Sequence, residues 1–435
     1  MVKSMHGPFS CDTGVMNDHD ERNQDAATLA GEVRAFYEHY PYPPPLDDLE
    51  KYRAWQDVKK RRAEYHLLWP SRDFDENLSI LIAGCGTSQA AKHAMRWPSA
   101  RVTGIDFSET SVRCTEDLKR KYKLDNLQVR HLPIERVREL ETSFDQIVCT
   151  GVLHHLPDPD AGLSALRGVL KSDGAMNVML YAPYGRAGIY MLQDFCKRLD
   201  VGATDVEIRD LIAALKALPP GHPLQTLLQD APDFRSAAAL GDALLHPCDR
   251  AYSVPQLFEF LERGGLNFGR WSRQAAYSPY CGALAQLPQT ERMRLLPEPE
   301  QFAISELFRG TMLRHSVIAY RNDAPDAPIP IRFADDAWFN YVPIPMPDTI
   351  RVRERLPAGA VAVLINQSHT YRDIYLTIDV TEARLFDAID GDRNVAAIVK
   401  QASGLLHGTP RADVVRTLFE RLWWHDQIVF DTSRR

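Results

Sequence analysis

The chain of 435 residues is longer than one ordinary domain, so it has room for two or three units that each bury a core. Its 45% hydrophobic and 25% charged residues are typical of a globular protein, and its formal net charge of -7 does not favour nucleic acid as a partner. Seven scattered cysteines without a CxxC pair, and no apolar leader or membrane-length run, predict a cytoplasmic protein without a disulfide frame, metal site or membrane span.

The N-terminal segment, residues 1–28, is polar and aperiodic, so we expect it to be disordered or to order only on binding. Helical spacing over 29–37 leads into a stiff Tyr-Pro-rich piece at 40–45. Because Tyr37, Tyr40 and Tyr42 adjoin this stiff piece, we predict that the segment closes over a bound ligand. A basic amphipathic helix is then predicted over 52–69, ending at Pro70.

The stretch ILIAGCGTSQA, residues 80–90, has the pattern of a strand, a glycine turn and a helix start. Such a turn at Gly84, Cys85 and Gly86 lets a ligand approach the backbone, and the free N–H groups of the helix start favour an anionic group. Asp106 ends the next predicted strand, twenty residues after Gly86. Its carboxylate can accept both ribose hydroxyls of an adenosyl group.

Short apolar runs alternate with helical stretches after residue 80. Strands are predicted at 80–84, 101–106, 127–132, 144–149 and 175–181, and helices at 90–96, 108–122 and 160–170. This alternation predicts an α/β fold with a parallel sheet, helices on both faces and a ligand at the carboxyl ends of the strands. Two further strands are expected at 266–271 and 315–321, with helical insertions at about 185–248 and 272–313.

A proline-rich linker at 322–330 separates the sheet from residues 331–435, which we expect to fold as a separate small α+β domain. Strands are predicted there at 360–365 and 373–378, followed by two helical stretches. The part from Phe386 to Phe430 weakly resembles the small winged-helix modules that bind leader peptides beside peptide-modifying enzymes. A dimerisation domain or a support for a lid is the alternative.

The glycine turn alone fits two cofactors. A dinucleotide site needs G-x-G-x-x-G, but Gln89 stands at the third glycine, which argues against an oxidoreductase. Further along, FDQIVCTGVLHHLPD at 144–158 and LKSDG at 170–174 resemble the class I S-adenosylmethionine-dependent methyltransferases. The resemblance covers 80–181 strongly and 30–321 more loosely. It implies a Rossmann-like, doubly wound sheet of seven strands whose last strand is antiparallel.

The resemblance also implies a set of cofactor-binding residues: Gly84, Cys85, Gly86, Thr87, Gln89, Asp106, Phe107, Ser108, Ile134, Thr150 and Gly151. The resemblance implies that the glycine turn lies along the methionine part of S-adenosylmethionine and that Asp106 binds the ribose. It also implies that Thr150 and Gly151 line the pocket near the sulfonium. The chain departs from the family at three places. It has Ile82 where a carboxylate is frequent, Ser88 where a further glycine is common, and LPIE at 132–135 where many members bind the adenine amine.

Methyl transfer is an in-line displacement on an activated carbon, so it requires a positioned acceptor and no protein nucleophile. We predict His154 as the general base for a hydroxyl or thiol and interpret His155 as a core residue. The residues expected near the acceptor are Tyr181, Tyr184, Arg186 and Tyr190, with Arg186 able to pair with a carboxylate or phosphate.

The two insertions predict an enclosed pocket, which suits a small molecule or a side chain of a peptide or protein. Two alternatives remain open at this point. One is a regulatory protein that binds S-adenosylmethionine without turnover, and the other is a nucleotide-cofactor oxidoreductase. A homo-oligomer is compatible with the sequence, which does not specify the oligomeric state.

Overall fold

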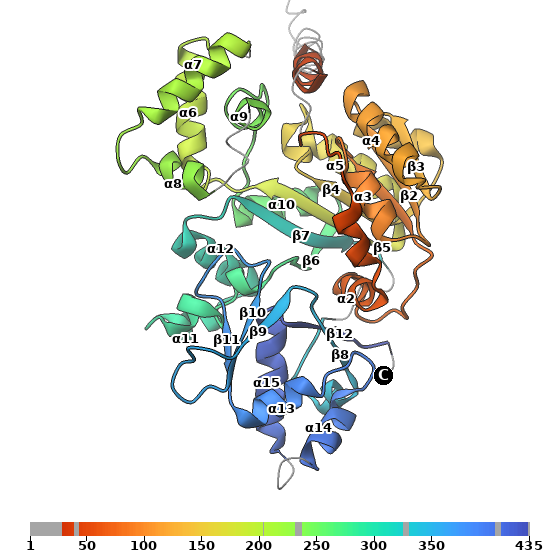
Figure 1. The fold of residues 1–435 in the computed structure, drawn as a ribbon, viewed down its shortest axis with the longest axis vertical. Helices are drawn as coiled ribbons and strands as arrows, with labels where there is room; N and C mark the ends of the chain where they lie inside the picture. The colour runs from red at the N-terminus through yellow and green to blue at the C-terminus, as the bar shows by residue number, and fades with distance from the viewer. Residues whose placement is uncertain are drawn as a thin grey trace, which may run out of the picture.

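The computed structural model describes residues 28–38, 43–202, 204–230, 237–324, 330–404 and 410–433. The predictions for residues 1–27, for Tyr40 and Tyr42, and for most of the linker lie outside these ranges. Seven strands form one sheet in the order β3-β2-β1-β4-β5-β7-β6 (Figure 1). They are β1 (Ser79–Ala83), β2 (Arg101–Asp106), β3 (Leu127–His131), β4 (Phe144–Thr150), β5 (Leu170–Tyr181), β6 (Leu266–Trp271) and β7 (Arg314–Arg321).

The pairing within the sheet confirms the expected seven strands and antiparallel last strand. β1 runs parallel to β2 and β4, and β7 runs antiparallel to β5 and β6. All five residues of β1 are buried, as an apolar central strand covered on both faces requires. The strand order reverses between β1 and β4, which is where open α/β sheets bind ligands.

Each face of the sheet is covered by helices with their own core. One face packs on α5 (Pro159–Val169), α10 (Val254–Arg263) and α12 (Glu298–Arg309). The other packs on α2 (Val58–Leu68) and α3 (Gln89–Arg96). The remaining helices beside the sheet are α4 (Glu109–Tyr122), η2 (Ile134–Leu140) and η3 (Leu153–His155).

The helix predicted over 52–69 is interrupted at Asp57. The Asp57 carboxylate accepts a hydrogen bond from the backbone N–H of Lys59 at 2.9 Å and so caps α2. The residues before it form a separate 3-10 helix, η1 (Glu50–Gln56). The prediction therefore missed a capping residue.

The described residues of the first insertion form a cap of four helices, the green group above the sheet in Figure 1. The cap has its own apolar core, which includes Ile189, Leu211 and Leu240. Its helices are α6 (Ala187–Arg198), α7 (Asp205–Lys216), α8 (Pro223–Asp230) and α9 (Ala237–Leu244). The second insertion contains η5 (Ala275–Tyr277), η6 (Gly282–Gln286) and α11 (Thr290–Arg294), and leads into α12. In the part of the chain that the structure describes, no helix has the length and apolar character needed to cross a membrane.

In the C-terminal region, residues 330–404 and 410–433 form two small antiparallel sheets, ordered β11-β10-β9 and β12-β8, and three α-helices. Its elements are η7 (Asp336–Asn340), β8 (Val342–Pro345), β9 (Thr349–Val352), β10 (Ala362–Asn366), β11 (Leu376–Ile378), α13 (Val380–Asp387), α14 (Val395–Ser403), α15 (Ala412–Trp424) and β12 (Ile428–Asp431). The sequence predicted β10 and β11 but missed the short strands β8 and β9. The winged-helix resemblance stays a prediction.

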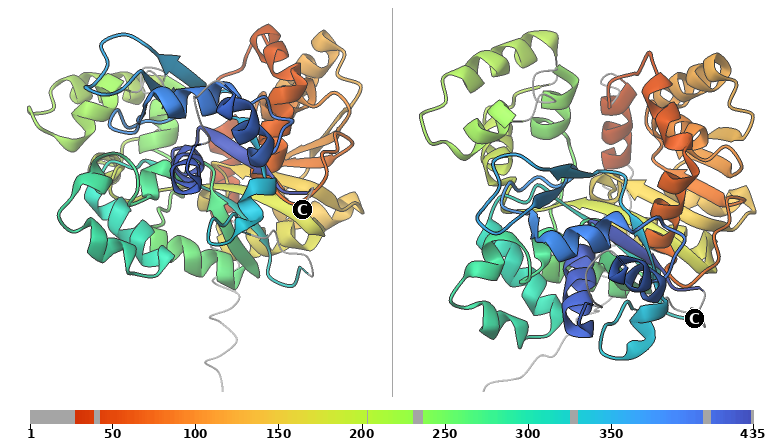
Figure 2. Two further views of the ribbon diagram at one scale, coloured as in Figure 1. Left: turned by 90° about the horizontal axis from the view of Figure 1, so that it is seen from below. Right: turned by 60° about the horizontal axis from the view of Figure 1, so that its bottom comes forward.

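The C-terminal region shares a core with the seven-stranded sheet. Ile344, Met346 and Val429 belong to the same buried cluster as Ile318 and Tyr320 of β7. Figure 2 shows the region, in blue, between the second insertion and the elements around α2. This shared core argues against the expectation that the region folds separately.

Candidate functional site

A cavity of about 1570 Å³ lies at the carboxyl ends of the parallel strands. Its walls come from the glycine turn, the ends of β2, β4 and β5, the helix at 28–38, the cap, and the start of β7. Residues 368–372 of the C-terminal region, in the loop between β10 and β11, complete it. A typical small-molecule pocket is about 300–1000 Å³, so this cavity has room for a cofactor and a second molecule.

The glycine turn after β1 forms one wall of the cavity. Gly84 has a φ of 68° and Gly86 a φ of 53°, which favour glycine. A Cβ placed on Gly84 would lie 2.4 Å from Cγ2 of Val152, so a side chain there would collide with the β4 loop. The turn therefore keeps its backbone open for close contact with a ligand.

The Asp106 carboxylate is fixed beside this turn by two backbone donors. The N–H of Gly86 donates to Oδ2 at 2.8 Å and the N–H of Ser108 donates to Oδ1 at 2.9 Å. Each oxygen keeps a second lone pair, and Asp106 lines the cavity. Burial raises the pKa of Asp106 to about 6. The site thus offers a fixed acceptor pair for two hydroxyl groups.

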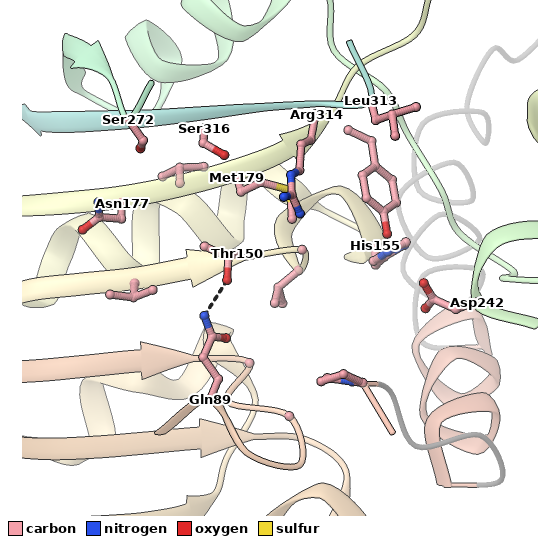
Figure 3. A pocket seen from close by; sticks show the side chains of 18 of the residues that line it. Gln89, Thr150, His155, Asn177, Met179, Asp242, Ser272, Leu313, Arg314 and Ser316 are labelled. Atoms are coloured by element: carbon pink, nitrogen blue, oxygen red, sulfur yellow. Dashed lines mark hydrogen bonds between the residues drawn. The ribbon is translucent and has the colours of Figure 1, made fainter. Parts of the chain in front are cut away.

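Most of the predicted cofactor-binding residues line the cavity. Across the reversal of strand order, Gln89 Nε2 donates to Thr150 Oγ1 at 2.7 Å (Figure 3). The predicted residues that line the cavity are Gly84, Gly86, Gln89, Asp106, Phe107, Ile134, Thr150 and Gly151. The turn and the ends of β2 and β4 therefore bring residues from distant parts of the sequence to one site.

The other three predicted cofactor-binding residues are absent from the lining and have structural roles. Cys85 is completely buried in the core beneath the turn. The Thr87 hydroxyl donates to the carbonyl of Pro43 at 2.8 Å, and the Ser108 hydroxyl caps α4 by accepting from the N–H of Ser111. These three side chains therefore stabilise the structure around the turn and do not reach the cavity.

The helix at residues 28–38 closes the cavity between α4 and α9 (Figure 1). At its end, Glu38 accepts hydrogen bonds from the backbone N–H of Glu109 at 2.7 Å and from the Thr110 hydroxyl at 2.6 Å. Tyr37 donates its hydroxyl proton to Oδ1 of Asp242 at 2.9 Å. The described part of the N-terminal segment thus ties the sheet to the cap over the cavity.

The structure reverses our assignment of the two neighbouring histidines on η3. His155 lines the cavity, whereas His154 does not. The His154 ring lies against Tyr181, with centroids 4.0 Å apart, and is completely buried with neither ring nitrogen hydrogen-bonded. His154 is therefore the packing residue of the pair, and His155 is the one with access to a ligand.

His155 has the tautomer required of a base. Its Nδ1–H donates to the carbonyl of Cys248 at 2.8 Å, which leaves the lone pair on Nε2. No partner for Nε2 occurs among the described residues. Burial lowers the pKa of His155, so the ring is neutral at neutral pH. It can accept a proton from a molecule in the cavity.

His155, Asp242 and His246 form a buried cluster whose ligand atoms lie within 4.8 Å of one another, a spacing that could hold a metal ion. The N–H of Cys248 donates to Nδ1 of His246 at 3.0 Å, so in the neutral ring Nε2 carries the proton and offers no lone pair. One Asp242 oxygen already accepts from Tyr37. The cluster is therefore better suited to transferring protons than to binding a metal.

The residues predicted near the acceptor have different environments. Arg186 is only 6% exposed, donates to Oδ2 of Asp249 at 3.1 Å and lies 3.5 Å over the Tyr181 ring. Its charge is thus already paired, which contradicts the predicted role as a free partner for a substrate anion. Tyr181 lines the cavity, but Tyr184 and Tyr190 do not. Tyr190 accepts a hydrogen bond from Arg186 instead.

Sequence reasoning missed the cavity residues that come from β7 and from the C-terminal region, among them Arg314, Ser316, Tyr371 and Arg372. For β7 a signal was available. Because β7 is antiparallel, its first residues lie at the same edge as the carboxyl ends of the parallel strands. No comparable signal marks the loop between β10 and β11, since its position depends on the docking of the C-terminal region.

Part of the chain matches a known domain family. Residues 81–176 match the family model described as "Methyltransferase domain". The chain is 30% identical over 271 residues to an uncharacterized protein of Synechococcus sp., covering 59% of this chain and 62% of that protein. It is 29% identical over 137 residues to the malonyl-[acyl-carrier protein] O-methyltransferase of Acetivibrio thermocellus, covering 31% of this chain and 46% of that enzyme. The chain thus spans less than two thirds of these curated relatives.

The fold is similar to that of PKMT2 from Rickettsia typhi. That structure superimposes with a TM-score of 0.61 at 15% identity, covering 87% of this chain and 75% of the other. The complex of PKMT2 with AdoHcy gives a TM-score of 0.60 at 16% identity. The structural similarity extends beyond the residues that match the family model. Because the sequence identity is only 15–16%, the similarity shows a shared fold and nothing about activity.

Proposed function

We propose that this protein is an S-adenosylmethionine-dependent methyltransferase acting on a small molecule or on a side chain of a peptide or protein. The observation that carries the proposal is Asp106, held by two backbone N–H groups beside an open glycine turn at the reversal of strand order. The methyltransferase domain at residues 81–176 supports it, as does the AdoHcy bound by PKMT2, whose fold is similar.

The residues of the cavity fit this cofactor. The turn at Gly84 and Gly86 lines the cavity with backbone that carries no side chain, which suits the methionine part, and Asp106 can accept both ribose hydroxyls. Thr150 and Gly151, at the end of β4, line the same cavity and would border the sulfonium. When bound, the cofactor supplies an activated methyl group. The protein holds the acceptor in line with it and keeps water out.

His155 is the residue that can take a proton from the acceptor. Its neutral ring presents an unshared Nε2 lone pair to the cavity, next to Tyr181, whose ring centroid lies 5.5 Å away. If the acceptor atom is a hydroxyl or a thiol, proton transfer to Nε2 accompanies attack on the methyl carbon. Tyr37 and Asp242 close the other side of this space. A cytoplasmic location stays a prediction.

Calorimetry on the purified protein tests the proposal. We expect S-adenosylmethionine and S-adenosylhomocysteine to bind one site per chain and NAD not to bind, and we expect methyl groups from labelled cofactor to appear on an acceptor. Binding of NAD alone would favour an oxidoreductase. Cofactor binding without turnover on any acceptor would favour a regulatory protein.

Asp106→Asn should weaken cofactor binding about 10- to 100-fold, the effect of losing a hydrogen bond to a charged group. The substitution keeps the volume but replaces one acceptor oxygen with a donor. In the natural protein, binding should also weaken as the pH falls through about 6, because protonation removes the carboxylate that the ribose requires. Titration calorimetry between pH 5 and pH 8 measures both effects. Unchanged affinity in a folded Asp106→Asn protein contradicts the assignment.

Removing residues 1–42 should weaken cofactor binding about tenfold while the sheet stays folded, because the helix at 28–38 forms a wall that the ligand-free protein already holds in place. Circular dichroism checks the fold and calorimetry the affinity. Glu32→Ala is the matched control, since Glu32 lies on the exposed side of the helix. If the shortened protein binds as tightly as the full chain, the helix serves only packing.

A further inference from the structure

We propose that the acceptor carries an oxyanion, a carboxylate or a phosphate, and that Arg314 and Arg372 bind it. The inference rests on the proposed function and names the chemical class of the second substrate. Both arginines line the cavity, one at the start of β7 and one on the loop between β10 and β11. They come from the seven-stranded sheet and the C-terminal region, so the site requires both parts of the chain.

The charges of the other arginines in the cavity wall are already balanced. The carboxylates that pair with them are Glu64 for Arg96 at 2.9 Å, Asp249 for Arg186 at 3.1 Å and Asp348 for Arg273 at 3.2 Å. Among the described residues, Arg314 and Arg372 have no ion pair or side-chain hydrogen bond, and both are exposed to the cavity. Among the described residues, these two positive charges therefore lack a counter-ion, as does Lys92 of α3, whose ammonium lies 5.4 Å over the ring of Tyr52.

Arg314 points to the place where the acceptor must lie. It is paired across the strands with Tyr181, and Figure 3 shows its side chain reaching from β7 into the pocket beside Met179. A Cβ on Gly151 would be 3.4 Å from the Met179 methyl group, so Met179 adjoins the end of β4. Ser316 and Ser272 add hydroxyl groups to the same wall.

Arg372 extends from a loop that is firmly anchored. The next residue, Asp373, accepts a hydrogen bond from the N–H of Ala283 at 2.7 Å and pairs with the buried Arg309 at 3.3 Å. The Arg309 guanidinium also lies 4.2 Å over the ring of Tyr371. The backbone on both sides of Arg372 is thus held in place while its own side chain stays free.

An anionic acceptor is the ligand that these charges favour. The carboxylates of Asp106 and Glu135 also line the cavity, but among the described residues neither pairs with Arg314 or Arg372, so a neutral or cationic acceptor would leave these two guanidinium groups unpaired. Asp242, on the cap side of the cavity, already accepts a hydrogen bond from Tyr37. Guanidinium groups bind carboxylates and phosphates through paired hydrogen bonds. An oxyanion between Arg314 and Arg372 would neutralise this part of the cavity and orient the acceptor.

The oxyanion holds the acceptor in place and is not changed chemically in the reaction. The lone pair of the acceptor atom forms the bond to the methyl carbon, the bond from that carbon to sulfur breaks, and its electron pair stays on sulfur. If the acceptor atom is a hydroxyl or thiol, its proton passes to Nε2 of His155. The two arginines act before this step, by setting the direction of approach.

The test uses the full chain saturated with S-adenosylhomocysteine and titrated with inorganic phosphate or with acetate. We expect one of the two anions to bind at a single site, and the preferred one identifies a phosphate or a carboxylate acceptor. Arg314→Gln and Arg372→Gln should each weaken that binding about 10- to 100-fold, the effect of losing a hydrogen bond to a charged group. Arg416→Gln is the control, an exposed arginine of the same C-terminal region outside the cavity.

A second measurement compares methyl transfer to matched acceptors with and without the anionic group, such as 3-mercaptopropionate and ethanethiol. The natural protein should prefer the anionic member of the pair in kcat/KM, and both variants should lose this preference. Absence of anion binding to the natural protein, or equal binding to the variants, overturns the inference. Failure of S-adenosylhomocysteine to bind at the start would instead refute the proposed function.

Discussion

Ending the chain at Arg321 is expected to abolish soluble folding. The truncation removes Ile344, Met346 and Val429, which are buried against Ile318 and Tyr320 on the face of the seven-stranded sheet. Each fully buried apolar side chain contributes about 1.5–3 kcal/mol. The loss is therefore comparable with the whole stability of a domain, about 5–15 kcal/mol.

The same truncation would leave buried charges without partners. Asp426, which is 2% exposed, pairs with Arg270 of β6 at 3.2 Å and accepts from the N–H of Ala275 at 3.0 Å. Asp431 lies 3.8 Å from the guanidinium of Arg62 of α2. Removing one partner of a buried ion pair costs about 3–5 kcal/mol, because the remaining charge stays desolvated.

Expression of residues 1–321 followed by circular dichroism and thermal unfolding measures this effect. Cleavage of the intact protein within the linker, at 325–329, is the control, because it breaks the chain while keeping every buried contact described above. We expect the two cleaved parts to elute together in size-exclusion chromatography. A soluble, cooperatively folding 1–321 fragment would show that the C-terminal region is dispensable for the core.

The alternation of apolar and helical stretches was sufficient to predict a parallel sheet with helices on both faces, because each parallel strand lies next to a crossover helix in the sequence. The seven strands and the antiparallel last strand were implied by the family resemblance. The position of the C-terminal region could not be predicted in this way. Its contacts join Val429 to Ile318 and Asp426 to Arg270, residues that are more than a hundred positions apart. The proline-rich linker indicated a C-terminal region that folds separately from the sheet. The strands β8 and β12 are too short for their sequence pattern to show that one face packs against the sheet.

At the site, sequence reasoning found residues of the cavity wall where backbone geometry decides the residue type. Gly84 and Asp106 line the cavity because a glycine turn and a strand end both lie at the carboxyl edge of the sheet, and their contact with a cofactor stays a prediction. It failed where the direction of a side chain decides which residue reaches the cavity. His154 and His155 are adjacent on a short 3-10 helix, and only the bond from His155 to the Cys248 carbonyl, ninety-three positions away, determines which ring reaches the cavity.

His155→Gln is expected to lower kcat about 10²- to 10⁴-fold on a hydroxyl or thiol acceptor, the usual contribution of a general base. Glutamine can still donate to the Cys248 carbonyl but cannot accept a proton at neutral pH. Cofactor affinity should stay unchanged, because Asp106 and the glycine turn lie on other loops. His154→Gln is the matched control, with a smaller effect on kcat at equal cofactor affinity.

The pH dependence of kcat separates a base from a packing residue. Because burial lowers the pKa of His155, the ring stays neutral and able to accept a proton below pH 6.5, the ordinary midpoint of histidine. The natural protein saturated with cofactor should therefore lose its kcat only at a pH below the ordinary midpoint of histidine. The residual activity of His155→Gln should lack this acidic decline. A decline that persists unchanged in the variant would mean that another group accepts the proton.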